Sequence, residues 1–166
     1  LFNALVETGE STLAVGEVFD SISICLSKGL GAPVGSLLIG SQPFIRQARR
    51  VRKAMGGGMR QAGFLSAAGI YALDHQVARL KEDNDRAKRL GEALAKQSYV
   101  SDVRPVQSNI VIFDLKVPWT AETYLAYLAE RGIKASAFGP QTVRFVTHLD
   151  VSASMIEQVL TEVGKI

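Results

Sequence analysis

Hydrophobic and polar side chains alternate from Ser21 to Leu26, where the sequence reads Ser-Ile-Ser-Ile-Cys-Leu. Alternation with a period of two residues, together with β-branched isoleucines, predicts a β-strand. A second apolar run at Val34–Ile39 predicts another short strand, and the glycines and proline between the two runs predict a turn. The first part of the chain is therefore expected to hold two short strands joined by a turn.

Two helices are predicted after the strands, because apolar residues recur there at intervals of three and four. The first runs from Pro43 to Met55, carries arginines on its polar side, and ends at the glycines Gly56–Gly58. The second runs without a break from about Gln61 to Lys96, and its polar side mixes both signs of charge, as solvated helix faces do.

The composition shifts at Gln97–Pro105, which predicts a linker or domain boundary. Beyond it the order of elements is that of a two-layer lobe with helices on one side of a small sheet. The expected elements are a strand at Ser108–Leu115, a helix at Thr120–Arg131, strands at Ile133–Ala137 and Val143–Thr147, and a helix from Ser152. We therefore predict two domains, residues 1–98 and 99–166.

The composition is that of a folded protein, because 47% of the 166 residues are hydrophobic and 21% are charged. A single cysteine, Cys25, permits no internal disulfide, so a reducing cytoplasm is the expected location. No apolar run approaches the roughly 18 residues of a membrane span. The opening residues, Leu1–Val6, read like the middle of a helix, and we expect the chain to begin inside a longer protein.

Charge is distributed unevenly although the net charge is only +3. Between Asp20 and Asp74 the chain has no acidic residue. The basic residues of this stretch are Lys28, Arg46, Arg49, Arg50, Arg52, Lys53 and Arg60. Such a block is typical of a solvated helix face, of an anion site or of a nucleic-acid-binding patch.

Lys28 is the first candidate for chemistry, because small residues surround it at the end of a predicted buried strand. A lysine there is either a surface charge or, when held in a cleft, an amine that forms a Schiff base with a carbonyl. The flanking glycines Gly29 and Gly31 would let a flat cofactor approach the backbone.

Other residues of reactive type have simpler interpretations. His148 at a strand end and His75 on a helix are expected to be structural, and Cys25 is expected to be a small buried side chain. No group of Cys, His and Asp has the spacing of metal ligands, so no metal is expected.

Three segments together resemble one known family. Phe19–Ser36, Arg52–Gly63, which contains Gly-Gly-Gly-Met-Arg-Gln, and Val143–Asp150 resemble blocks of the low-specificity L-threonine aldolases in matching order and spacing. The resemblance implies α/β proteins of pyridoxal-phosphate fold type I, the aspartate-aminotransferase-like fold. Residues 1–98 would be the end of the large cofactor-binding domain with a long connecting helix, and 99–166 the small C-terminal α+β domain. The family's Asp-Gly-Ala-Arg element, its ring-stacking histidine and its Gly-Thr phosphate cradle are absent from the sequence.

The resemblance also implies roles for four residues. Lys28 would be the Schiff-base lysine, and Lys53 and Arg60 would reach the cofactor phosphate from a neighbouring subunit of a homo-oligomer, a dimer of dimers. Arg144 would bind the α-carboxylate of the substrate, although on the strand pattern alone it is a surface ion-pair residue. The planar guanidinium of arginine can bind a carboxylate or a phosphate through two parallel hydrogen bonds, and the lysine ammonium binds such anions as a point charge.

The function implied is a pyridoxal-phosphate-dependent aldolase that cleaves threonine, allo-threonine and related β-hydroxy-α-amino acids to glycine and an aldehyde. The residues present are expected to be inactive by themselves. One alternative is a related pyridoxal-phosphate lyase acting on other β-hydroxy amino acids. An alternative of another class is a basic nucleic-acid-binding module, which the lack of aromatic residues among the arginines disfavours, since only Phe44 lies within that helix. Neither nucleic acid nor a membrane is therefore an expected partner.

Overall fold

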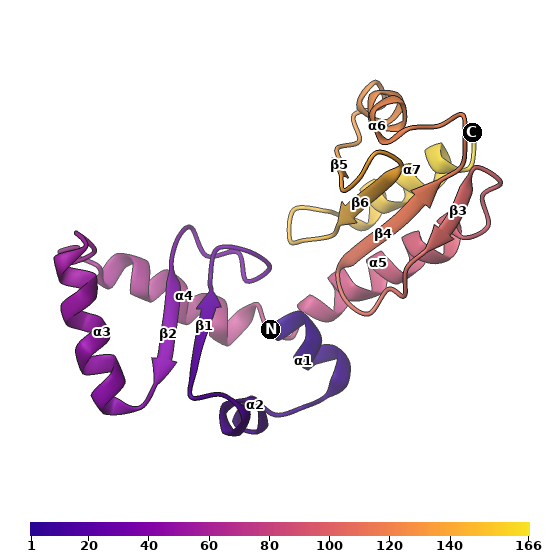
Figure 1. Ribbon diagram of the computed structural model, residues 1–166. Coiled ribbons are helices and arrows are strands. Elements are labelled where there is room, and N and C mark those ends of the chain that lie inside the picture. Colours follow the sequence, from indigo (N-terminus) through magenta and orange to yellow (C-terminus); the bar gives the residue numbers. More distant parts are fainter. The chain divides into compact units, whose positions relative to one another are not determined.

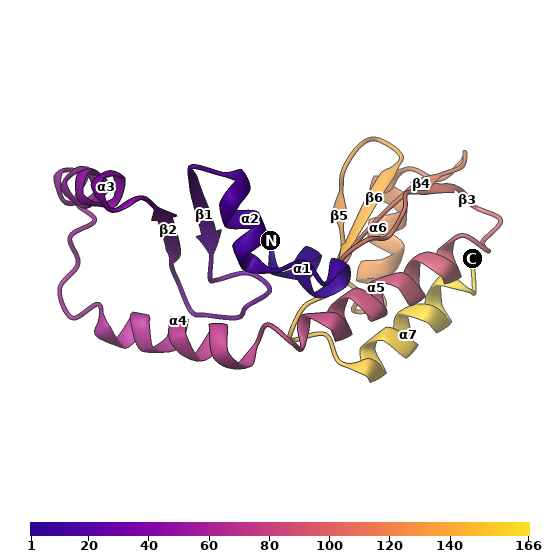
Figure 2. The same ribbon diagram turned by 90° about the horizontal axis from the view of Figure 1, so that it is seen from below.

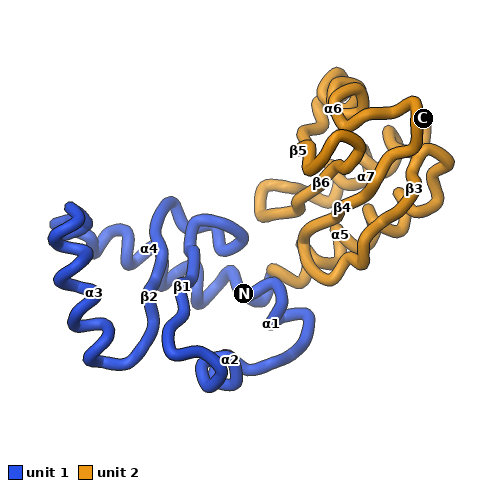
Figure 3. The backbone as a smooth tube through the Cα atoms, in the orientation of Figure 1, with its two compact units in different colours: residues 1–79 blue, residues 80–166 orange.

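The computed structural model describes residues 1–166, which divide into two compact units, Leu1–Arg79 and Leu80–Ile166 (Figure 3). In this structure the units part near Arg79, whereas the predicted domain boundary between residues 98 and 99 falls inside the second unit. Residues 80–98 join the second unit because apolar side chains of this stretch, among them Leu90 and Leu94, are buried in its core.

The first unit contains four helices and one pair of strands (Figure 1). They are α1 (Phe2–Thr8), α2 (Thr12–Val18), β1 (Ser21–Cys25), β2 (Ser36–Gly40), α3 (Gln42–Ala54) and α4 (Gly63–His75). The expected strand pair is confirmed, since β1 and β2 form an antiparallel two-stranded sheet. Ile24 is buried and Cys25 is exposed. The prediction of a buried cysteine was therefore wrong, because strand alternation turns Cys25 to the face opposite Ile24.

The long helix predicted from Gln61 to Lys96 is two helices, α4 and α5 (Leu80–Leu94), separated by a turn at residues 76–79. Each of the two buries its own apolar positions. In α4 these are Gly69 and Ala72, and a Cβ at Gly69 would lie 3.0 Å from a methyl carbon of Leu26. This close approach packs α4 against the end of β1.

The second unit is built around a sheet with the strand order β3-β4-β6-β5, in which all neighbours are antiparallel. After α5 its elements are β3 (Val100–Val103), β4 (Ile110–Leu115), α6 (Ala121–Ala129), β5 (Ser136–Ala137), β6 (Thr142–Val146) and α7 (Ala153–Val163). The linker expected at Gln97–Pro105 contains β3, an edge strand that pairs with β4. Helices α5 and α7 lie side by side on one face of this sheet (Figures 1 and 2).

Aromatic and aliphatic side chains close the core of the second unit. Phe113 and Tyr124 are fully buried and meet edge to face with ring centroids 5.7 Å apart. The Tyr99 hydroxyl donates to the Val163 carbonyl at 2.9 Å and lies 3.3 Å from the Tyr124 hydroxyl. Burial raises the pKa of both tyrosines, so they stay neutral donors.

Local signals set the ends of the last helices. Thr120 and Thr123 form a reciprocal capping box at α6, and the Ser152 hydroxyl accepts from the Met155 N–H at 3.2 Å at α7. Gly132, with φ of 72°, follows α6 as the expected stop. No helix in the structure has the length and apolar character needed to cross a bilayer.

Candidate functional site

Lys28 lies in the connection between β1 and β2, which folds back on itself through backbone hydrogen bonds. The Ala32 N–H donates to the Leu26 carbonyl at 3.0 Å, and the Gly31 N–H donates to the Lys28 carbonyl at 2.8 Å. Gly31 has φ of 69°, a left-handed conformation that favours glycine. Leu26 and Leu30 are buried and anchor the connection on both sides of Lys28.

The side chain of Lys28 is exposed, and its amine takes part in no hydrogen bond or ion pair of the chain. An amine on an anchored turn with no internal partner is available to a ligand. The sequence predicted a lysine at the end of a buried strand. Lys28 does follow β1, but the strand is not buried as a whole, because Ile24 is its only buried residue.

The glycines after α3 form a Schellman motif. The Gly57 N–H donates to the Arg52 carbonyl at 2.8 Å, the Gly56 N–H donates to the Lys53 carbonyl at 3.1 Å, and Gly56 has φ of 83°. The glycine run therefore turns back over the last turn of the helix.

Gly58 leaves space that the Lys53 side chain occupies. A Cβ at Gly58 would lie 2.4 Å from Cδ and 3.0 Å from Nζ of Lys53. The missing side chain thus allows the Lys53 ammonium to lie over the glycine backbone. Arg60 follows two residues later and is exposed.

The cations between Asp20 and Asp74 have no carboxylate partners. Lys28, Lys53, Arg60 and the α3 arginines make no ion pair in the chain, because no acidic residue lies between Asp20 and Asp74. Unpaired lysine and arginine side chains beside a glycine turn suit an anion such as a phosphate.

Arg144 belongs to the second unit, on β6, where it pairs with Ile112 of β4 and Ser136 of β5. Its Nε donates to the Ser136 hydroxyl at 3.2 Å, and its guanidinium carbon lies 5.7 Å from the centroid of the Phe138 ring. Arg144 makes no ion pair, so the interpretation as a surface ion-pair residue does not describe it. Its two terminal nitrogens form no hydrogen bond within the chain.

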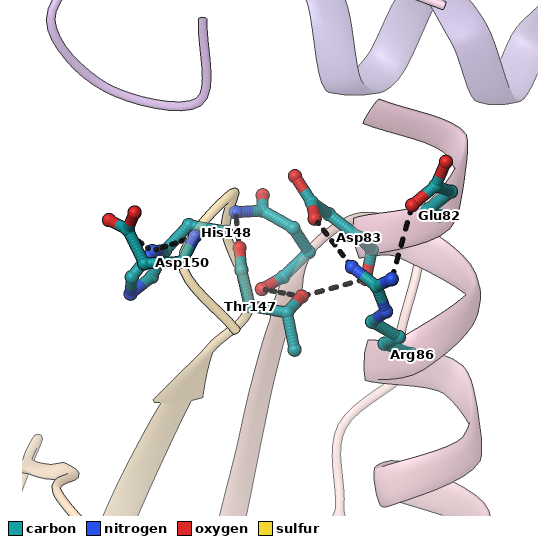
Figure 4. Close-up of polar contacts among 7 residues, drawn as sticks. Glu82, Asp83, Arg86, Thr147, His148 and Asp150 are labelled. Atoms are coloured by element: carbon teal, nitrogen blue, oxygen red, sulfur yellow. Dashed lines mark hydrogen bonds and ion pairs between the residues drawn. The ribbon is translucent and has the colours of Figure 1, made fainter. Parts of the chain in front are cut away.

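Residues after β6 are tied to the start of α5 (Figure 4). The Thr147 hydroxyl donates to the Asp83 carbonyl at 2.7 Å, and the Asp83 carboxylate lies 3.6 Å from Arg86. His148 is half-exposed, and its Nδ1 accepts from the Asp150 N–H at 3.3 Å. These contacts fit the structural role expected of His148.

Lys28, Lys53 and Arg60 thus lie in the first unit, and Arg144 lies in the second. Sequence reasoning did not single out Ser136 and Phe138. A signal for them was present, because the turn expected at Gly139-Pro140 brings the residues before it opposite those after it.

Comparisons with known proteins agree on one family. A family model described as beta-eliminating lyase matches residues 1–118. The low-specificity L-threonine aldolase of Escherichia coli K12 is 43% identical over 159 residues, which are 96% of this chain and 46% of that protein. An Arabidopsis thaliana protein named low-specificity L-threonine aldolase 1 is 38% identical over 164 residues, 97% of this chain and 46% of the relative. The chain therefore spans about half the length of the curated relatives it matches.

Solved structures share the fold at low identity. A Listeria monocytogenes protein, provisionally assigned as an L-allo-threonine aldolase, matches 99% of this chain and 49% of its own with a TM-score of 0.77 and 19% identity. Serine palmitoyltransferase from Sphingomonas wittichii matches 92% of this chain and 40% of its own with a TM-score of 0.72 and 18% identity. The expected α/β fold class, pyridoxal-phosphate fold type I, is confirmed.

Proposed function

The chain belongs to the beta-eliminating lyase family, and on that premise we propose that the protein is a pyridoxal-phosphate-dependent aldolase. It cleaves threonine, allo-threonine and related β-hydroxy-α-amino acids to glycine and an aldehyde. The identity of 43% to the Escherichia coli enzyme supports this assignment. The chain spans about half of that relative, and the activity is proposed for the protein as a whole.

The observation that carries the proposal is the Lys28 turn. Two buried leucines anchor the turn, and Gly31 supplies the left-handed conformation that the turn requires. The Lys28 amine has no partner within the chain. A lysine that serves as a covalent anchor needs this combination of a fixed backbone and a free amine.

The residues present fit pyridoxal phosphate. Lys28 would hold the cofactor covalently, and Lys53 and Arg60 would neutralise its phosphate. The Lys53 side chain lies over Gly58, beside the glycine turn that ends α3, and this placement supports the fit. When bound, the cofactor supplies an electron sink that stabilises negative charge on the substrate α-carbon.

Arg144 would bind the α-carboxylate of the substrate. Its free terminal nitrogens form a planar fork that matches the two oxygens of a carboxylate. This contact holds the amino acid by a group that the reaction leaves unchanged, so it orients every substrate of the class alike.

We extend the proposal to assembly and location. The protein forms a homo-oligomer, a dimer of dimers, in which Lys53 and Arg60 reach the phosphate bound by a neighbouring subunit. Their lack of partners within the chain supports a role toward another molecule. A cytoplasmic location is supported by the lone thiol, Cys25, which is exposed and unpaired.

A second candidate is a related lyase on other β-hydroxy amino acids or on substrates of β-elimination. The match of residues 1–118 to a family model described as beta-eliminating lyase favours it. The two functions share the Lys28 anchor and differ in product, because only the aldolase releases glycine and acetaldehyde from threonine.

The test is borohydride reduction of the holoenzyme, followed by mass spectrometry of its peptides. We expect a pyridoxyl group on Lys28 in the wild type and in Lys53→Ala, and none in Lys28→Ala. A label on Lys53 in the wild type would overturn the anchor assignment. Glycine and acetaldehyde formed from threonine then separate the aldolase from the second candidate.

A further inference from the structure

Helices α5 and α7 cover one face of the sheet in the second unit (Figure 2). Arg144 lies on the other face, because its neighbours on β6, Val143 and Phe145, are buried in the core. Side chains alternate along β6, so Val143 and Phe145 enter the core while Arg144 and Thr142 point to the opposite face. On this face Ser136 of β5 is the direct neighbour of Arg144.

Two residues on the β5 side fix the orientation of the Arg144 guanidinium. The Ser136 hydroxyl accepts from Nε at 3.2 Å and is itself placed 3.5 Å from the Arg144 carbonyl. The Phe138 ring lies under the guanidinium, with its centroid 5.7 Å from Cζ, within the range of a cation–π contact. Because Nε is hydrogen-bonded to Ser136, Nη1 and Nη2 are the guanidinium nitrogens that remain free to bind a ligand.

A third contact binds the neighbouring carboxylate, Asp114, to Thr142. Asp114 of β4 lies opposite Thr142, diagonal to Arg144 on the same face, where a long side chain can reach it. The Thr142 hydroxyl donates to Asp114 Oδ1 at 2.5 Å, and Asp114 makes no ion pair with Arg144.

We propose that Ser136 is a positioning residue that sets Arg144 to receive a carboxylate end-on, and that Thr142 keeps Arg144 available by holding Asp114. This inference rests on the proposed role of Arg144 in carboxylate binding. It adds the mode of binding, through Nη1 and Nη2, and names the residues that enforce it. A guanidinium that is already oriented loses less conformational entropy when it binds the carboxylate.

The first experiment measures the binding of glycine and of methylamine to the holoenzyme by calorimetry, since methylamine has no carboxylate. Loss of a hydrogen bond to a charged group corresponds to about tenfold weaker binding. Ser136→Ala is therefore expected to weaken glycine binding about tenfold and to leave methylamine unchanged. Ser136→Thr, which keeps the hydroxyl, is expected to restore glycine binding. With threonine, Ser136→Ala is expected to raise KM more than it lowers kcat.

Arg144→Ala separates failure of this inference from failure of the proposed function. Weak glycine binding in Arg144→Ala combined with normal binding in Ser136→Ala would refute the positioning role alone. Normal glycine binding in both variants would refute the carboxylate role of Arg144 and the inference with it. Non-additive losses in the double variant are expected, because Ser136 acts through Arg144.

The second experiment releases Asp114. Thr142→Val preserves the β-branched shape and removes the hydroxyl, so the Asp114 carboxylate is free to pair with Arg144. Glycine binding is expected to fall, and Thr142→Val with Asp114→Asn is expected to recover it. Thr161→Val is the matched control, since the Thr161 hydroxyl bonds only to the Glu157 carbonyl of α7. Equal binding by Thr142→Val and the wild type would overturn the protective role of Thr142.

Discussion

The two compact units differ in how much of their apolar surface they bury. The second unit encloses a continuous core in which Val111, Phe113, Tyr124 and Leu128 are all 0% exposed. In the first unit the large apolar side chains lie mostly at the surface, and Phe64 is 84% exposed. One unit is held by its own core, whereas the other has no comparable core of its own.

The candidate functional residues are distributed between these two units. The candidate cofactor residues Lys28, Lys53 and Arg60 all lie in the first unit, which is built on a two-stranded sheet. The candidate carboxylate site lies in the second unit, on a sheet fastened to a closed core. Cofactor affinity and folding stability are therefore expected to respond to different substitutions.

The largest effect is expected when the units are separated. Residues 80–166 alone are expected to unfold in one cooperative thermal transition and to show near-ultraviolet circular dichroism from packed aromatic rings. Residues 1–79 alone are expected to show neither, because they bury few large side chains. A cooperative transition in residues 1–79 would break the comparison.

The next effect contrasts two phenylalanines. Phe113→Ala is expected to lower the free energy of unfolding of the second unit by about 3–5 kcal/mol, because it empties space in a closed core. Phe64→Ala, at an exposed position of the first unit, is expected to change stability by less than about 0.5 kcal/mol. Urea titrations of the two variants measure both values, and similar losses would contradict the contrast.

A smaller effect concerns cofactor retention. Arg60→Ala is expected to weaken pyridoxal phosphate binding about ten- to a hundredfold, the loss of one charge-assisted contact. Arg49→Ala, in the middle of α3, is expected to leave the dissociation constant near that of the wild type. Dialysis against falling cofactor concentrations compares the two, and equal dissociation constants would remove Arg60 from the phosphate site.

The smallest effect is a pH dependence in the second unit. The hydrogen bond from Lys165, at 2.6 Å, is the main cause that holds the pKa of Glu162 below its usual value, and Arg131 contributes. A carboxyl group whose pKa is lower in the folded state stabilises the fold at pH values above its unfolded-state pKa. This stabilisation is lost as the pH falls through the folded-state pKa. Wild type and Glu162→Gln should therefore differ in Tm at neutral pH and converge in acid. The control Glu92→Gln, at an exposed position, should show no such convergence.

Most of the elements follow from local patterns. The pair β1 and β2, helix α3 with its glycine stop, and helix α7 were all predicted close to where they occur. The break between α4 and α5 was missed, because residues 76–79 contain neither glycine nor proline to mark it. Strand β3 was missed because its polar residues form a strand through pairing with β4, a partner that no local pattern shows.

The candidate site, like the fold, is predictable from the sequence only in part. The positions of Lys28 on a turn and of Arg144 on a strand follow from nearby residues. The contacts of Arg144 with Ser136 and of Thr142 with Asp114 depend on the register of β5, β6 and β4. A one-residue shift in that register would turn each side chain to the other face, so hydrophobic periodicity alone does not reveal these pairs.

The sheet formed by β1 and β2 has a practical consequence for handling the first unit. Both strands have a second edge whose backbone groups pair with no other strand, and Leu37, Leu38 and Ile39 of β2 are substantially exposed. Free strand edges with apolar side chains are templates on which extended chains aggregate. Residues 1–79 are therefore expected to aggregate when produced alone, and a charged residue in place of Leu38 is expected to reduce such pairing of strand edges.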